Sequence, residues 1–240
     1  PFQNPADWGG FYWTSQYAFN IGVSFVEEPH NFGRVWFPCL DNFVDRATYD
    51  FFITTDSTRK AFCGGLLQQE LSNPDGSKTW HWFLSQDIPT YLASVAVADY
   101  ASLEWNYQGL ERSIPVVLAA RPLDTTNLRN SFQHLDSAIA AYEQMFLPYQ
   151  FDRVGYAIVP FSAGAMEHAC NIAYMRFAID GSLAYESLMA HELSHHWWGD
   201  LVTCQTASDM WLNEGWASYS EFLFDEFVYG SNNFHKLFLH

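Results

Sequence analysis

Two histidines and a glutamate near the C-terminal end have the types and spacing that metal chemistry needs. They stand in the stretch SLMAHELSHHWWGDL, residues 187 to 201. Residues four apart in a helix project from nearly the same face, so His191 and His195 can offer two imidazole nitrogens to one ion. Glu192 lies about 100° around such a helix from His191, beside the metal position, where it can act on a metal-activated water. The alternative is a buried helix whose histidines are satisfied by hydrogen bonds.

A third ligand is available on the segment WLNEGWASYSEF, residues 211 to 222. Eighteen residues separate His195 from Glu214, which is enough to end one helix, turn, and return along a second helix packed against it. Two histidines and a glutamate, with a fourth position left open, form one of the standard zinc sets of hydrolytic enzymes. HExxH joined to a glutamate in NEGW is far more specific than HExxH alone. The sequence therefore predicts one zinc ion per chain, held by His191, His195 and Glu214.

Two further polar residues have less specific patterns. Glu221 lies seven residues after Glu214, on nearly the same helical face, where its carboxylate can accept a proton from a ligand imidazole and fix the tautomer of that ring. A solvated surface glutamate is the equal alternative for Glu221. His196 faces away from the histidine pair, so we interpret it as a packing residue or an outer support of the site.

Helices and strands around the site follow from periodicity and caps. One helix is expected from about 182 to 198, where a serine can cap its start and a glycine follows its end. A second helix is expected to begin after residue 209, an aspartate. Upstream, apolar residues at intervals of three and four predict a single helix over 124 to 147, and strands are expected at 153 to 160 and 171 to 179.

The first half of the chain has a different pattern. From residue 11 to about 120, short apolar and aromatic runs alternate with turn signals such as NPDGS at 73 to 77, which is typical of antiparallel sheet. Helical periodicity begins after Arg121 and Pro122. The sequence therefore predicts an α+β protein, with a β-rich domain at residues 1–121 and a second domain at residues 122–240.

Composition excludes several classes of partner. The 240 residues are 49% hydrophobic, enough for a packed core, and the net charge of -16 with no basic run argues against nucleic acid and anionic membrane as partners. No apolar stretch approaches the length of a transmembrane segment, and the sequence carries no signal that decides the compartment. The four cysteines contain no CxxC pair, so we expect isolated thiols.

Four motifs give the chain a resemblance to a known family. In chain order they are RVWFPCLDN at 34 to 42, SAGAMEH at 162 to 168, HELSHHWWGD at 191 to 200 and WLNEGWASYSE at 211 to 221. This set resembles the gluzincin zinc aminopeptidases typified by aminopeptidase N and leukotriene hydrolase, and the resemblance covers nearly the whole chain. It implies a saddle-like antiparallel β domain followed by a thermolysin-like zinc metallopeptidase catalytic domain, each of them partial here.

The resemblance also implies roles for individual residues. The three histidine and glutamate ligands predicted above would bind zinc, and Glu192 would be the general base. Glu167 matches the glutamate of the family's GxMEN motif and would bind the free α-amine of the substrate. Gly164 and Ala165 would present backbone groups to the substrate chain. Peptides with a free N-terminus are therefore the expected substrates.

Two features depart from the family pattern. His168 stands where the family usually has asparagine, so hydrogen bonding to the substrate backbone is expected to differ. The family also has an oxyanion-stabilising tyrosine well downstream of the third zinc ligand, and the sequence stops at His240 before that region. We therefore expect a fragment of a zinc aminopeptidase that is weak or inactive alone. The alternatives are a non-catalytic zinc-binding or peptide-binding fragment and an endopeptidase of the same clan.

Overall fold

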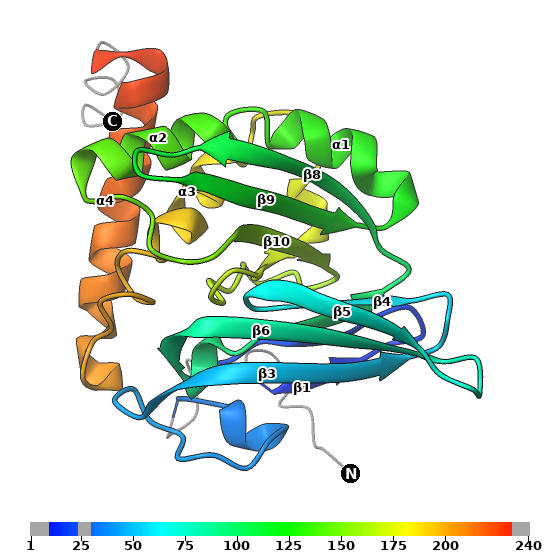
Figure 1. Ribbon diagram of the computed structural model, residues 1–240. Helices are drawn as coiled ribbons and strands as arrows, with labels where there is room; N and C mark the ends of the chain where they lie inside the picture. The colour runs from blue at the N-terminus through cyan, green and yellow to red at the C-terminus, as the bar shows by residue number, and fades with distance from the viewer. Residues whose placement is uncertain (1–9, 24–29, 232–240) are drawn as a thin grey trace.

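The computed structural model describes residues 10–23 and 30–231, with strands in the first half and helices mainly in the second (Figure 1). The strands are β1 Phe11–Trp13, β2 Ala18–Asn20, β3 Arg46–Thr55, β4 Lys60–Cys63, β5 Leu66–Ser72, β6 Lys78–Pro89, β7 Val95–Ala98, β8 Ala101–Gln108, β9 Ser113–Ala120, β10 Val154–Val159 and β11 Ile172–Met175. The α-helices are α1 Thr125–Ser131, α2 Leu135–Met145, α3 Glu186–Ser194 and α4 Met210–Tyr229. Short 3₁₀ turns are Gly33–Val35, Thr90–Leu92, Pro122–Asp124, Arg176–Ala178 and Ala207–Asp209. The expected α+β class is confirmed.

Two antiparallel sheets form the β-rich first half, as the alternating pattern predicts. One has the order β1-β2-β7-β4 and the other has the order β3-β6-β5. Along β6 the side chains of Trp80, Trp82 and Leu84 alternate with more exposed neighbours, so this strand buries one face. The predicted turn at 73 to 77 joins β5 to β6 in an antiparallel hairpin. The last residues of the first apolar run, at 24 and 25, lie outside the described residues.

The third sheet has the order β11-β10-β9-β8, with β9, β10 and β11 parallel and β8 antiparallel to β9. Helices α1 and α2 lie over β8 and β9 (Figure 1). Strand β10 is fully buried, which explains its continuous apolar run in the sequence. Strands β8 and β9 precede residue 121, and β9 pairs with β10, which follows it. One sheet therefore contains strands from both sides of residue 121. The domain boundary at that residue stays a prediction.

The expected single helix over 124 to 147 is two helices, because the backbone turns at Phe132. The ring of Phe132 packs edge-on against Tyr156 and Tyr174 beneath it. The hydroxyl of Ser131, the last residue of α1, accepts a hydrogen bond from the Gly181 backbone N–H at 3.0 Å. Tertiary contacts therefore break a pattern whose periodicity is continuous. The predicted apolar face is correct, since its residues through Tyr142 are buried.

Helix α3 is shorter than the expected 182 to 198, whereas α4 begins where the sequence predicts. Ser182 does not cap α3; its hydroxyl accepts from the Ala184 N–H at 3.1 Å in the preceding turn. Beyond Ser194 the chain forms turns that continue through Gly199, whose φ of 148° favours glycine, to Leu201. His195, the second of the predicted zinc ligands, thus lies just after the last residue of α3.

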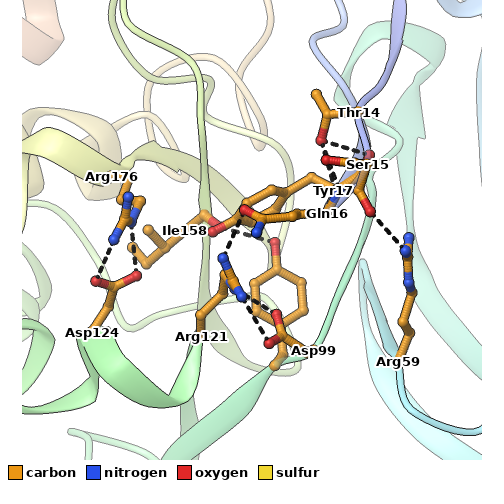
Figure 2. Close-up of polar contacts among 11 residues, drawn as sticks. Thr14, Ser15, Gln16, Tyr17, Arg59, Asp99, Arg121, Asp124, Ile158 and Arg176 are labelled. Carbon is orange, nitrogen blue, oxygen red and sulfur yellow. Dashed lines mark hydrogen bonds and ion pairs between the residues drawn. The ribbon is translucent and has the colours of Figure 1, made fainter.

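Figure 2 shows polar contacts around Arg121, one of which joins the turn between β1 and β2 to the end of β9. The Arg121 guanidinium pairs with Asp99 at 2.6 Å and donates to the Gln16 side chain at 2.7 Å. Arg176 pairs with Asp124 at 2.8 Å. One continuous apolar core contains buried residues of all three sheets.

The four cysteines are unpaired, as expected. Within residues 10–23 and 30–231, no helix combines the length and apolar character needed to cross a membrane.

Candidate metal centre and active site

Three donor atoms from α3, the turn after it, and α4 converge on one point. The Nε2 atoms of His191 and His195 lie 3.2 Å apart, and the Glu214 Oε2 atom lies 3.4 Å from the first and 3.7 Å from the second. Ligands of a tetrahedral zinc ion with bonds of about 2.0–2.1 Å are separated by about 3.3 Å. The spacing of these three donors therefore fits a zinc ion.

The proton positions of both imidazoles also fit metal binding. The His191 Nδ1 atom lies 2.8 Å from the Glu221 carboxylate, and the His195 Nδ1 atom lies 3.0 Å from the Trp198 carbonyl oxygen. Both oxygens accept, so each Nδ1 carries a proton and each Nε2 is the nitrogen left to bind a metal ion. Both Nε2 atoms face Glu214, which is the arrangement that metal-binding histidines need.

The surroundings raise the pKa of His191 and lower the pKa of His195. Burial lowers the pKa of His191, but hydrogen bonds to Glu214 and Glu221 outweigh burial and raise that pKa to about 10. Burial lowers the pKa of His195 below its usual value. The surroundings of His191 therefore favour a positive charge at this ring. A metal ion that binds there would take the place of a proton.

Helix packing sets the distance between the donors. Helices α3 and α4 pack directly against each other, and α2 packs against both. The Tyr142 hydroxyl on α2 lies 3.1 Å from the Ala190 carbonyl of α3 and 3.0 Å from the Ser220 carbonyl of α4. Ala217 and Phe224 of α4 are fully buried. The packing of the three helices therefore holds Glu214 close to the histidines.

The donors lie on the wall of a cavity of about 420 Å³. The other sequence-predicted residues on this wall are Gly164, Ala165, Glu167 and Glu192. One oxygen of Glu167, one oxygen of Glu192 and one nitrogen of His195 lie within 4.8 Å of one another. The structure thus brings together the motif at 162 to 168 and the motif at 191 to 200, which are separated in the sequence by strand β11.

Both carboxylates beside the metal position are buried. Glu167 is 7% exposed and Glu192 is 5% exposed. Burial raises the pKa of Glu192 to about 7, partly offset by the neighbouring histidines. Burial, followed by the negative charge of Glu214, raises the pKa of Glu167. A positive partner would stabilise the ionised form of both carboxyl groups. They therefore mark the places where a cation, an ammonium group or a proton would be held.

Two residues singled out from the sequence lie away from the cavity. His168 is fully buried and is absent from the cavity wall; its Nε2 atom lies 3.3 Å from the Asn20 side-chain nitrogen. His196 is also buried, and its Nδ1 atom lies 2.7 Å from the Tyr149 hydroxyl. The packing interpretation of His196 agrees with these contacts.

Sequence reasoning missed several residues of the cavity wall. His30 and Val23 come from the β-rich half, and Leu188, Met210 and Trp211 come from α3 and α4. The position of Leu188, three residues before His191 on the same helical face, could have been derived from helix geometry. No spacing rule connects His30 to residues more than a hundred positions away.

A HExxH helix, a glutamate on the next helix and a deep cavity beside them are the features of the zinc metallopeptidase class. Residues 131–240 match the family model described as the peptidase family M1 domain, and residues 9–92 match the peptidase M1 N-terminal domain. The chain belongs to the M1 peptidase family.

Similar proteins agree with this membership. Aminopeptidase B from Rattus norvegicus is 26% identical over 200 residues, which cover 82% of this chain and 29% of the relative. Endoplasmic reticulum aminopeptidase 1 from Homo sapiens is 27% identical over 226 residues, covering 88% and 23%. A mutant M1 zinc metallopeptidase from Deinococcus radiodurans, bound to a Tyr-Ser-Ala substrate, has a TM-score of 0.78 at 25% identity, covering 91% of this chain and 48% of that one. The chain thus spans less than a third of these two curated relatives.

Proposed function

We propose that this chain carries the zinc site and the amine-binding site of an aminopeptidase, which releases N-terminal residues from peptides. The observation that carries the proposal is the convergence of a His-His-Glu donor set and a separate buried carboxylate on one cavity. The M1 family membership and the aminopeptidase relatives support the same reaction class.

The zinc ligands in this proposal are His191, His195 and Glu214. Their separations, and the two Nδ1 contacts that leave both Nε2 atoms free to bind, support one ion per chain. When bound, zinc acts as a Lewis acid that makes a water molecule acidic and polarises the scissile carbonyl.

Glu192 is the proposed general base. It lies on the cavity wall next to the donor set and is not itself one of the three converging ligands. Its carboxylate takes a proton from the attacking water and later gives the proton to the leaving amine. The low exposure of Glu192 keeps bulk water from competing for this proton.

Glu167 is the proposed partner of the substrate's α-ammonium group. An ion pair at this end of the cavity places the first peptide bond next to Glu192 and the ligand set, which accounts for cleavage at the N-terminus. Gly164 and Ala165 lie on the same wall, where their backbone groups can bind the extended substrate. A peptide with a free N-terminus is therefore the proposed substrate class.

A direct test compares free and blocked substrates on the zinc-loaded chain. We expect slow release of arylamine from L-leucine arylamide, at least tenfold slower release from its Nα-acetylated form, and a further loss of at least about 100-fold in kcat for Glu192→Gln. Equal cleavage of free and blocked peptides would favour the endopeptidase alternative. Stoichiometric zinc and peptide binding with no turnover above that of Glu192→Gln would favour a non-catalytic binding role.

A further inference from the structure

The segment that follows Glu167 is attached to the β-rich half of the protein. The Ala169 backbone N–H donates to the Leu92 carbonyl oxygen at 3.3 Å, and the Asn171 side-chain amide donates to the Phe62 carbonyl oxygen at 3.1 Å. All of these residues are buried. The orientation of the segment is therefore set by strands from the other half of the chain.

Among the contacts with the β-rich half, the one nearest to Glu167 along the chain is made by His168, whose partner Asn20 is itself held by two further hydrogen bonds. The Asn20 side-chain oxygen accepts from the Val95 backbone N–H at 2.7 Å, and its amide nitrogen donates to the Ala93 carbonyl at 2.8 Å. The same nitrogen lies 3.3 Å from the His168 Nε2 atom. The Val95 contact fixes which end of the amide is oxygen, so Asn20 can only donate to His168.

The chemistry of His168 follows from this geometry. Because Asn20 donates, the His168 Nε2 atom accepts and the proton of the ring is on Nδ1. The ring is fully buried, and burial lowers its pKa to about 3. His168 is therefore a neutral acceptor near neutral pH, where its contact with Asn20 does not depend on titration of the ring.

We propose that His168 is a positioning residue for Glu167, and that the Asn20–His168 hydrogen bond sets where the amine-binding carboxylate lies relative to the zinc ligands. This inference rests on the proposed aminopeptidase function. Glu167 and His168 are adjacent in the chain but point to different places, the first to the cavity and the second to the junction with the β-rich half. A rotation of the backbone that breaks the junction contact therefore moves the carboxylate.

The size of the effect follows from the tolerance of such sites. A misplacement of about 1 Å commonly costs on the order of 100-fold in catalytic efficiency. His168→Ala removes the acceptor and leaves a space in a buried junction, so we expect about a tenfold or greater loss of preference for a free amine. His168→Gln can place its side-chain oxygen near the former Nε2 position and should recover most of this preference.

The experiment measures binding and turnover on the zinc-loaded chain. Trp211 lies on the cavity wall, so its fluorescence can report binding of L-leucine hydroxamate and of the Nα-acetylated hydroxamate. The ratio of the two dissociation constants is the preference for a free amine. Zinc stoichiometry and the unfolding midpoint are measured on every variant. His81→Asn is the matched control, because His81 pairs with Asp50 at 2.6 Å outside the cavity wall.

We expect His168→Ala to retain zinc and to lose the preference for a free amine, mainly through weaker binding of the free-amine ligand. His168→Gln and His81→Asn should keep this preference. Asn20→Ser breaks the same contact from the other side and should act in the same direction. Either disrupting variant, folded and zinc-loaded, that keeps the full preference overturns the proposal. An unchanged chain that binds free and acetylated ligands equally would overturn the proposed function and this inference together.

Discussion

Removing the Glu221 carboxylate tests how far zinc binding depends on the orientation of the His191 ring. The Glu221 oxygen lies 2.8 Å from the His191 Nδ1 atom and accepts a hydrogen bond from its N–H. This contact orients the opposite nitrogen of the ring toward the metal position. Loss of such an outer contact typically weakens metal binding about 10- to 100-fold. That range corresponds to about 1.4–2.7 kcal/mol.

The structure places the expected effect near the lower end of this range. The Glu221 side chain is 34% exposed, so water can replace part of the lost contact. We expect Glu221→Ala to weaken zinc binding about tenfold, and Glu221→Gln to weaken it less because the amide oxygen still accepts. His195 has no corresponding mutation, because its support is the backbone carbonyl of Trp198.

Competition with a chromophoric zinc chelator of known affinity measures this difference. Glu226→Ala is the control, since Glu226 lies on the same helix and its side chain is exposed. The unfolding midpoint of each variant in the absence of zinc separates loss of binding from loss of structure. If Glu221→Ala and Glu226→Ala both bound zinc as tightly as the unchanged chain, the orienting role of Glu221 would be wrong.

Three further substitutions test other parts of the account. Glu192→Gln should keep zinc and lose at least about 100-fold in kcat, because an amide cannot take the water's proton; zinc content and turnover are measured together. Glu167→Ala should raise KM for free-amine arylamides and leave the slow cleavage of acetylated ones unchanged, and an equal loss on both would contradict amine binding. Tyr142→Phe should lower the free energy of unfolding by about 1–2 kcal/mol in urea titrations, because its hydroxyl shares one hydrogen between a carbonyl of α3 and a carbonyl of α4 and both lose this donor. An unfolding midpoint identical to that of the unchanged chain would contradict this estimate.

The donor set was predictable because its geometry is local. Helix periodicity alone places His191 and His195 on one face, and the short interval to Glu214 leaves room for one turn and a second packed helix. Both relations depend on the backbone over a few tens of residues. For the same reason, the start of α4 and the position of β10 follow directly from a cap and an apolar run.

Tertiary contacts decided the features that the sequence did not predict. The break between α1 and α2 arises where Phe132 packs against two strands, and no local signal marks it. Helix α3 ends at Ser194, and in the turns that follow it the Trp198 carbonyl accepts a hydrogen bond from the His195 Nδ1–H. Apolar periodicity cannot show where a helix exchanges its own hydrogen bonds for those of a binding site.

Long-range contacts explain the remaining differences. The sequence leaves the surroundings of His168 open, whereas in the structure the ring lies against Asn20, 148 positions earlier in the chain. Glu221 could equally have been a surface glutamate, and only the packing of α4 on α3 brings it to His191. Residue type and spacing identify which groups can do chemistry, but the partner that fixes each group lies on a distant element.

The zinc content of the purified chain, with and without the third donor, tests the central claim most directly. After dialysis against a weak chelator, elemental analysis should find one zinc ion per unchanged chain and far less in Glu214→Ala, because two imidazoles alone hold the ion too weakly. The Glu214→Ala variant should unfold at the same midpoint as the zinc-free unchanged chain. Equal zinc in both proteins, or none in either after zinc loading, would contradict the assignment of His191, His195 and Glu214 as the metal centre.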